Sequence, residues 1–251
     1  MSIADHPIIT ERYFFPMQVP LPEARMVEVE GGELACYSAD GGHELTVVHF
    51  HGNGEIVGDY VPGFVRHLDR LGANAFFAEY RGYGGSTGTP QLGRMLDDVP
   101  AIRGAIEKPD QQLVVFGRSI GSIYAIEFAA RFPNIAGLVV ESGIADVLER
   151  IILRATPREL STTLEEMEQE FAELFDHRQK LGNFTGPSLF LHATGDHLVD
   201  KSHAERNAEW AGDRARLVLF ERGDHNSIFH ANRDAYLREL QRFLTSIKSG
   251  R

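Results

Sequence analysis

Cysteine is almost absent from this sequence, because Cys36 is the only one in 251 residues. A single thiol excludes an intrachain disulfide, and it excludes a zinc cluster built from thiolates of this chain. Chains that depend on disulfides belong to oxidising compartments. The cysteine content therefore fits a reducing compartment.

Long apolar runs and an excess of basic charge are also missing. No stretch approaches the ~18 to 20 apolar residues of a membrane helix, and the N-terminus lacks the pattern of a secretory signal. The 25 basic residues are outnumbered by 36 acidic ones, which gives a formal charge of −11. Because nucleic acids and anionic membranes attract a basic surface, we expect neither as a partner. The sequence predicts a soluble, cytoplasmic protein.

Short apolar runs alternate with helical patterns along the chain. Residues 25–37 alternate apolar and polar side chains and predict an edge hairpin that turns at Gly31-Gly32. Buried strands are expected at residues 45–50, 75–78, 113–116 and 138–140, further strands at 188–192 and 217–220, and helices at 60–71, 95–106, 122–132 and 228–247. This alternation predicts the α/β class, with a mostly parallel sheet flanked by helices in one domain over residues 1–251.

Residues 145–181 interrupt the alternation. They carry no strand signal but two amphipathic patterns, which Pro157 separates. The second pattern has no basic residue before Arg178 and predicts an acidic outer face, with Glu165, Glu166, Glu168, Glu170, Glu173 and Asp176. An insertion at this point of a doubly wound sheet lies near the carboxyl ends of the strands, where ligands bind. We expect a helical cap insertion over a pocket; a solvated helix packed on the core is the alternative.

The clearest chemical signal is the sequence Gly117-Arg118-Ser119-Ile120-Gly121, which lies between a predicted strand and a predicted helix. The pattern G-x-S-x-G in this context is typical of a nucleophile elbow, a strained turn that presents a serine at the edge of the sheet. Glycines flank the serine because neighbouring backbone approaches too closely for a β-carbon. Ser119 is therefore the predicted nucleophile.

A serine hydroxyl needs a base that takes its proton and a carboxylate that orients the base. Asp196 follows the strand expected at residues 188–192, and His225 follows the one at 217–220, so both are expected on the same edge as Ser119. Asp200 and Asp224 are alternative acids, but Asp224 adjoins His225 and Asp200 lies farther from its strand. We predict Asp196 as the acid and His225 as the base.

The tetrahedral intermediate of acyl transfer carries an oxyanion, which needs two preset N–H donors. The elbow supplies one of them, the backbone N–H of Ile120. The motif His51-Gly52-Asn53-Gly54 directly follows the strand expected at residues 45–50, and its turn can aim the N–H of Asn53 into the site. We expect Asn53 and Ile120 to form the oxyanion hole; for the Asn53 motif, a simple strand-to-helix turn is the alternative.

The other ten histidines are expected at the surface or in packing contacts, although His197 and His230 can lie near the mouth of the site. His49 and His51 have the spacing of two metal ligands on one strand face, but no obvious third ligand accompanies them. We predict neither a metal nor a cofactor.

Three motifs together resemble one branch of the α/β-hydrolase superfamily. They are His51-Gly52-Asn53-Gly54, Glu79-Tyr80-Arg81-Gly82-Tyr83-Gly84-Gly85-Ser86 and Gly117-Arg118-Ser119-Ile120-Gly121. The resemblance extends from about Glu28 to the C-terminal helix. That branch includes eukaryotic acyl-protein thioesterases, which act on fatty-acyl thioesters of proteins, and bacterial members of unknown substrate. It implies an α/β-hydrolase fold and the same site residues: Ser119, Asp196 and His225, with Asn53 and Ile120 as oxyanion donors.

Some features depart from that branch. Glu79 stands where the branch usually has Asp, which is compatible with a carboxylate that only braces the following loop. The N-terminal cysteine cluster or membrane helix of some eukaryotic members is absent, so membrane-bound depalmitoylation is not implied.

The insert after Ser142 is individual to this chain. Its bulky apolar residues can line an acyl pocket or can simply pack two helices against the core. They are Ile151, Ile152, Leu153, Met167, Phe171 and Phe175. Arg81 and Arg118 are expected near the same edge, where each can meet a substrate carboxylate or form a salt bridge within the protein.

The sequence thus predicts a cofactor-free serine hydrolase that cleaves a carboxylic ester or thioester of a small acyl substrate through an acyl-enzyme on Ser119. Amide or peptide hydrolysis, and a perhydrolase or lyase reaction, can use the same residues. A binding protein that keeps the fold without turnover is the alternative from another class.

Overall fold

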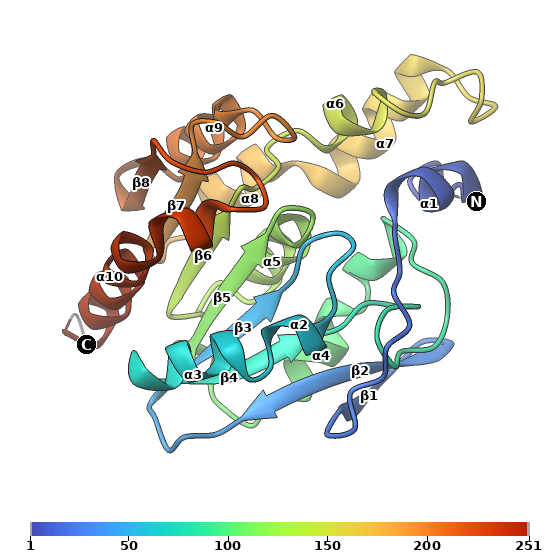
Figure 1. The fold of residues 1–251 in the computed structure, drawn as a ribbon. Helices are drawn as coiled ribbons and strands as arrows, with labels where there is room; N and C mark the ends of the chain where they lie inside the picture. Colours follow the sequence, from blue (N-terminus) through green and yellow to red (C-terminus); the bar gives the residue numbers. More distant parts are fainter. Residues whose placement is uncertain (1, 250–251) are drawn as a thin grey trace.

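The structure, a computed structural model, describes residues 2–249 and is built around one eight-stranded sheet (Figure 1). The strand order is β1-β2-β4-β3-β5-β6-β7-β8. The first two strands form the antiparallel edge hairpin, β2 pairs antiparallel with β4, and every later pair is parallel. The strands are β1 (Arg25–Val29), β2 (Gly32–Ala39), β3 (Leu45–Phe50), β4 (Ala73–Ala78), β5 (Leu113–Arg118), β6 (Gly137–Glu141), β7 (Ser188–Ala193) and β8 (Ala215–Phe220).

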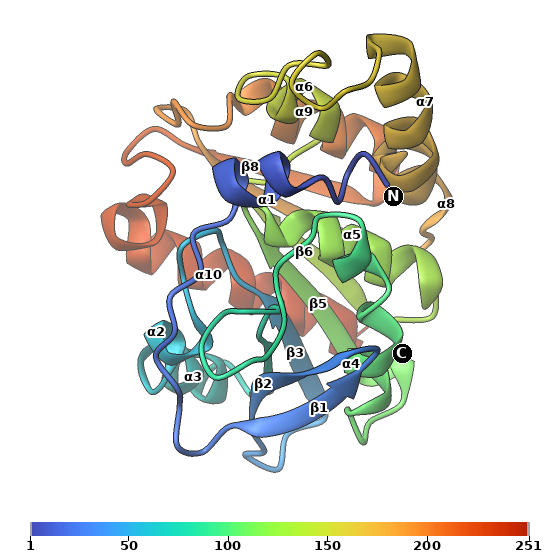
Figure 2. The same cartoon turned by 90° about the vertical axis from the view of Figure 1, so that its right-hand side faces the viewer.

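Helices cover both faces of the sheet, so the predicted mostly parallel sheet flanked by helices is confirmed (Figures 1 and 2). One face carries α2 (Val57–Tyr60), α3 (Gly63–Arg70) and α10 (Ile228–Ser249). The other carries α4 (Val99–Gly104), α5 (Gly121–Arg131), α8 (His177–Asn183) and α9 (Lys201–Ala211). Short 3₁₀ turns occur at η1 (Arg94–Leu96), η2 (Asp110–Gln112) and η3 (Gly212–Arg214).

The central strands are buried along their whole length because helices cover both of their faces. Every residue of β3, β4, β6 and β7 is buried. Alternate side chains enter the two cores: Val115 of β5 packs toward α5, whereas Val114 and Phe116 pack toward α3 and α10. Cys36 of β2 is fully buried, and this burial raises the pKa of its thiol to about 12.

Two predicted helices differ from the observed ones, in both cases at a proline. The helix expected at residues 60–71 is wrong at its start: α3 begins only at Gly63, after Pro62, and Tyr60 is the last residue of the separate helix α2. The helix expected at residues 95–106 consists of η1 and the later α4, which has Pro100 in its first turn. Proline has no backbone N–H and fits only the first turn of a helix, so both patterns are interrupted where the ring occurs.

The segment between β6 and β7 contains α6 (Val147–Ile151), α7 (Leu164–Phe175) and α8. Figure 2 shows α6 and α7 beyond the ends of the central strands, with α1 (Pro7–Tyr13) next to them. Ser2, which precedes α1, donates to Glu170 of this segment at 2.6 Å. Arg12, which lies in α1, donates to Glu159 at 2.8 Å. The N-terminal residues are thus tied to the insertion.

None of the helices in the described part of the chain combines the length and the apolar character that crossing a bilayer requires.

Candidate active site

The turn between β5 and α5 holds Ser119 in a backbone conformation that is rare for a side-chain-bearing residue. Its φ is 53°, in the left-handed region. Three hydrogen bonds hold the strained residue. Its N–H donates to the carbonyl of Glu141 at 2.9 Å, and its carbonyl accepts from the N–H and the hydroxyl of Ser122 at 3.0 and 2.6 Å. The end of β6 and the first turn of α5 therefore fix the serine from both sides.

The glycines on either side of Ser119 occupy positions that no larger residue fits. A β-carbon on Gly117 would lie 2.6 Å from the carbonyl oxygen of Gly121, and one on Gly121 would lie 2.2 Å from the carbonyl oxygen of Phe50. Both obstacles are backbone atoms, which cannot rotate away. The elbow thus packs directly against the end of β3.

The structure brings Ser119, Asp196 and His225 into one hydrogen-bonded line. Nε2 of His225 lies 2.8 Å from Oγ of Ser119, and Nδ1 lies 2.7 Å from Oδ2 of Asp196. The three residues are 8%, 4% and 6% exposed, so water is largely excluded from the contacts. The alternative acids lie elsewhere: Asp200 accepts from the N–H of Ser202 at the start of α9, and exposed Asp224 accepts from Ser227.

The environment of Asp196 favours its ionised form. Burial opposes the charge, but the hydrogen bond and charge of His225, with the N–H of Val199, outweigh it, so the pKa of Asp196 is below its ordinary value. Its Oδ1 accepts the N–H groups of Leu198 and Val199 at 2.9 and 2.8 Å. Because a carboxylate only accepts, Nδ1 of His225 carries the proton and Nε2 is free to accept one from Ser119.

The two predicted oxyanion donors lie at the turns that follow β3 and β5. Ile120 directly precedes α5, and Asn53 lies in the turn after β3. Within residues 2–249, neither backbone N–H has a hydrogen-bond acceptor. Both amides are therefore available to an external oxygen atom.

The side chain of Asn53 forms structural hydrogen bonds that the sequence did not predict. Its Oδ1 accepts from the N–H of Phe15 at 3.1 Å and from the hydroxyl of Tyr83 at 2.8 Å, and its Nδ2 donates to the carbonyl of Tyr13. The N-terminal segment thereby fixes the turn that carries the Asn53 amide. The Tyr83 motif was visible in the sequence, but no local signal linked residues 13–15 to the turn.

His51, which opens the same turn, is paired with Glu79. The two side chains are each 1% exposed, and Nε2 of His51 lies 2.6 Å from Oε1 of Glu79. Burial disfavours the charged imidazole, but the charge of Glu79 and its hydrogen bond outweigh burial and raise the pKa of His51. Glu79 also accepts from the N–H of Val57 at 2.9 Å. Because Oε1 of Glu79 accepts from the N–H of Tyr80 at 3.1 Å as well, the carboxylate braces both the turn after β3 and the loop that follows β4.

His49 lies apart from His51 in a cage of aromatic rings. The ring centroids of Tyr60, Phe116 and Phe77 lie 4.5, 4.8 and 5.0 Å from its own. Burial lowers the pKa of His49 well below its usual range, so the ring is neutral. Among the described residues, no group of three or more His, Cys, Asp or Glu side chains is arranged to hold a metal ion.

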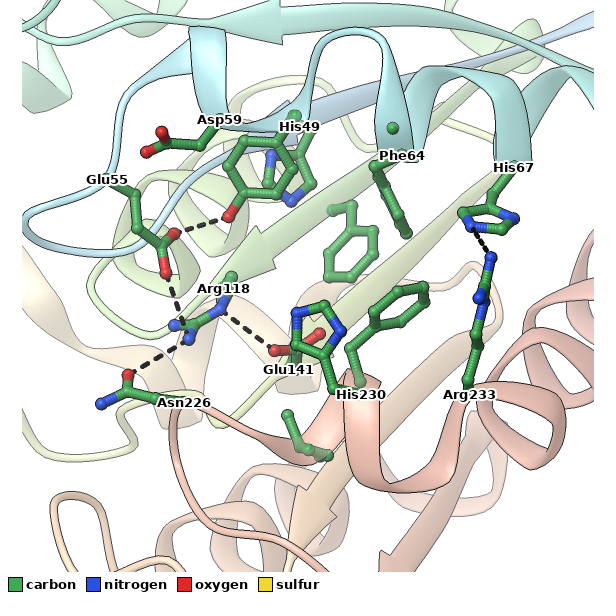
Figure 3. Close-up of a pocket in the computed structure, with 15 residues that line it drawn as sticks. His49, Glu55, Asp59, Phe64, His67, Arg118, Glu141, Asn226, His230 and Arg233 are labelled. Carbon is green, nitrogen blue, oxygen red and sulfur yellow. Dashed lines mark hydrogen bonds and ion pairs between the residues drawn. The ribbon is translucent and has the colours of Figure 1, made fainter.

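Both arginines near the site form salt bridges within the protein. The guanidinium of Arg81 contacts Asp98 in a two-pronged arrangement at 2.7 and 2.5 Å, with both side chains 4% exposed. Arg118 lies 3.1 Å from Glu55 and 3.2 Å from Glu141. A cavity of about 390 Å³ lies on the α3 and α10 side of Arg118 (Figure 3). Its lining includes Arg118 but none of Ser119, Asp196 and His225.

The apolar residues of the insertion divide into two groups. Ile151, Met167, Phe171 and Phe175 are at most 5% exposed and pack in the core, so they hold the helices down. Ile152 and Leu153 are 42% and 65% exposed. Of the six apolar residues considered from the sequence, these two remain open to other molecules.

Comparisons with known proteins agree with this architecture. The chain is 28% identical over 211 residues to the uncharacterized protein YfhR of Escherichia coli O157:H7, covering 80% of this chain and 70% of that protein. It is 24% identical over 221 residues to alpha/beta hydrolase domain-containing protein 17B of Xenopus tropicalis, covering 86% and 72%. The esterase Pf2001 of Pyrococcus furiosus superposes with a TM-score of 0.71 at 18% identity, covering 92% and 98%.

Residues 41–176, more than half of the chain, match the family described as serine aminopeptidase, S33. This region contains the turn after β3, the elbow and most of the insertion. The α/β-hydrolase fold predicted from the sequence is confirmed. The chain belongs to the serine aminopeptidase S33 family, and it is a hydrolase of the α/β-hydrolase superfamily.

Proposed function

We propose that this protein is a serine hydrolase that cleaves a carboxylic ester or thioester through an acyl-enzyme on Ser119. The observation that carries the proposal is the hydrogen-bonded line from Ser119 through His225 to Asp196, at 2.8 and 2.7 Å. A serine within 3 Å of a base that is itself oriented by a carboxylate has the arrangement of an activated nucleophile.

In the first half of the reaction, Oγ of Ser119 attacks the substrate carbonyl while Nε2 of His225 takes its proton. The backbone N–H groups of Asn53 and Ile120 stabilise the oxyanion, and Asp196 stabilises the imidazolium that forms. The intermediate collapses, the bond to the leaving alcohol or thiol breaks, and His225 returns the proton to it. Ser119 then carries the acyl group as an ester.

In the second half, a water molecule loses a proton to Nε2 of His225 and attacks the acyl carbonyl. The same two amides stabilise the second oxyanion. Collapse releases the carboxylic acid, and His225 returns the proton to Oγ of Ser119. All these steps use groups of the chain itself.

We propose that residues 145–181 act as a cap over this site. Its outer helices lie beyond the ends of the central strands, among them β5, which leads to Ser119, and two side-chain bonds join the insertion to α1 and the residues before it (Figure 2). The exposed side chains of Ile152 and Leu153 supply apolar surface for an acyl group. The three motifs and the similarity to the 17B protein support placing this chain in the branch that acts on acyl thioesters.

Peptide or amide hydrolysis is the second candidate, because the matched family is described as a serine aminopeptidase. It uses the same nucleophile and differs in the leaving group, an amine in place of an alcohol or thiol. Parallel assays with p-nitrophenyl esters, acyl thioesters and aminoacyl p-nitroanilides separate the two functions.

The direct test of an activated serine is the intact mass of the folded protein after treatment with a fluorophosphonate. We expect one adduct on the native protein and none on heat-denatured protein or on Ser119→Ala. Ser38→Ala, a change of an exposed serine on β2, is the matched control and should label like the wild type. Adduct formation on Ser119→Ala would contradict the assignment of the nucleophile, and an unlabelled wild type would contradict the proposed function.

A further inference from the structure

We propose that Arg118 is a positioning residue, which fixes the loop of His225 and the turn of Asn53 in their places relative to Ser119. This inference rests on the proposed function. It concerns a side chain that precedes the nucleophile in the chain and lies between the other parts of the site.

The first contact of Arg118 is with the loop that carries the base. Its Nη2 donates to the backbone carbonyl of His225 at 3.0 Å and lies 3.4 Å from Oδ1 of Asn226. A hydrogen bond to the carbonyl of His225 fixes the peptide from which the imidazole extends. The 2.8 Å contact between His225 and Ser119 therefore depends on where the guanidinium lies.

The second contact is with the turn that carries the amide of Asn53. Nη2 of Arg118 lies 3.1 Å from Oε1 of Glu55, and Oε2 of Glu55 accepts from the N–H of Gly52 at 2.6 Å and from the hydroxyl of Tyr60 at 2.5 Å. A β-carbon on Gly52 would lie 2.7 Å from Nη1 of Arg118, so the guanidinium packs on the backbone of the turn. Arg118 thus contacts the residue directly before Asn53.

The third contact is with the end of β6. Nε of Arg118 lies 3.2 Å from Oε1 of Glu141, whose other oxygen accepts from the hydroxyl of Tyr236. The carbonyl of Glu141 is the group that accepts the N–H of Ser119 at 2.9 Å. The same guanidinium therefore reaches the residue that holds the strained nucleophile.

The form of the side chain suits this task. Figure 3 shows the guanidinium of Arg118 between Glu55, Glu141 and Asn226, at one end of the cavity that α3 and α10 border. The side chains of Arg118 and Glu141 are 12% and 6% exposed, so the charges are paired away from bulk water. A guanidinium presents five N–H donors in a rigid fork, whereas the ammonium of lysine concentrates its donors at one point. Lysine keeps the charge here but cannot make all of these contacts at once.

The test compares Arg118→Lys with Arg103→Lys. Arg103 also pairs with a carboxylate, Asp110, and donates to two backbone carbonyls, but it lies in α4 and its partners precede the first residue of β5. For each variant we would measure the rate of fluorophosphonate labelling, kcat and KM on the best ester from pH 6 to 9, and Tm. The wild type serves as the reference for labelling.

For Arg118→Lys we expect labelling and kcat to fall about 100-fold with KM within about threefold, because a displacement near 1 Å at a reacting group has an effect of this size. Arg103→Lys should change none of these rates. Glu55→Gln, which keeps the shape of the carboxylate, should slow labelling about tenfold and provides the same test if Arg118→Lys does not fold.

Labelling of folded Arg118→Lys and Glu55→Gln within threefold of the wild type would overturn the inference, whatever their Tm, because the network would then be only structural. A labelled wild type with unaffected variants leaves the proposed function intact. An unlabelled wild type overturns the proposed function and this inference together.

Discussion

Replacing Gly121 with alanine tests how closely the nucleophile elbow packs against β3. The added β-carbon would lie 2.2 Å from the carbonyl oxygen of Phe50 and 2.6 Å from that of His51. Ordinary contact begins near 3.4 Å, so α5 and β3 must separate by about 1.2 Å. Overpacking of this kind typically costs about 1–3 kcal/mol, and because backbone atoms cannot rotate away, we expect the upper end. At about 3 kcal/mol, Tm falls by about 6–12 °C in a chain of this length.

The same separation moves Ile120 away from Asn53, because the first lies at the start of α5 and the second follows β3. A displacement near 1 Å predicts that fluorophosphonate labelling of Gly121→Ala slows about 100-fold. The control is Gly104→Ala, at the exposed end of α4, where an added β-carbon meets nothing within 4 Å. This control should keep the wild-type labelling rate and gain up to about 1 kcal/mol. A Gly121→Ala protein that melts and labels like the wild type would refute the packing argument.

Three other changes have expected outcomes that follow from the contacts. Asp98→Asn removes the charge that pairs the buried guanidinium of Arg81, so the free energy of unfolding in a urea titration should fall by about 3 kcal/mol; a loss below about 1 kcal/mol would contradict this. Burial lowers the pKa of His177 to about 4. Below about pH 6.5 the unfolded chain therefore binds a proton at this histidine that the folded chain does not bind. The free energy of unfolding should fall by up to about 3 kcal/mol between pH 6.5 and pH 4. In His177→Gln the free energy of unfolding should lose this part of its pH dependence. If its slope between pH 6.5 and pH 4 equals that of the wild type, the argument about His177 is wrong. Tyr83→Phe removes the hydroxyl bonded to Asn53 and should lower stability by about 1 kcal/mol and slow labelling severalfold, as measured by melting and by the adduct time course.

Much of the fold was predictable because the central strands are buried on both faces. Such strands are nearly continuous apolar runs, and the run at residues 45–50 coincides with β3. The convergence of Ser119, Asp196 and His225 was predictable for a related reason, since each follows a strand of one parallel sheet and such strands end at the same edge. The helix expected at residues 60–71 was wrong at its start, because its periodicity continues across Pro62, where the ring breaks the helix.

The contacts that hold the site in place were not predictable from local patterns. The bond from Phe15 to Asn53 joins residues 38 positions apart, and the bond from Arg118 to the carbonyl of His225 joins residues 107 positions apart. Neither partner has a periodicity or motif that indicates the other. Sequence patterns report which face of an element is buried, whereas such hydrogen bonds depend on how whole elements are placed in three dimensions.

The burial of Cys36 has a practical consequence for following the motions of this protein. The side chain is 0% exposed in β2, its thiol has a pKa of about 12, and the chain has no second cysteine. An alkylating reagent at pH 8 therefore reacts only in molecules whose edge hairpin has opened. Under conditions where closing is faster than alkylation, the reaction rate gives the free energy of that opening. Alkylation of Cys36 thus measures transient opening of the edge hairpin without any engineered cysteine.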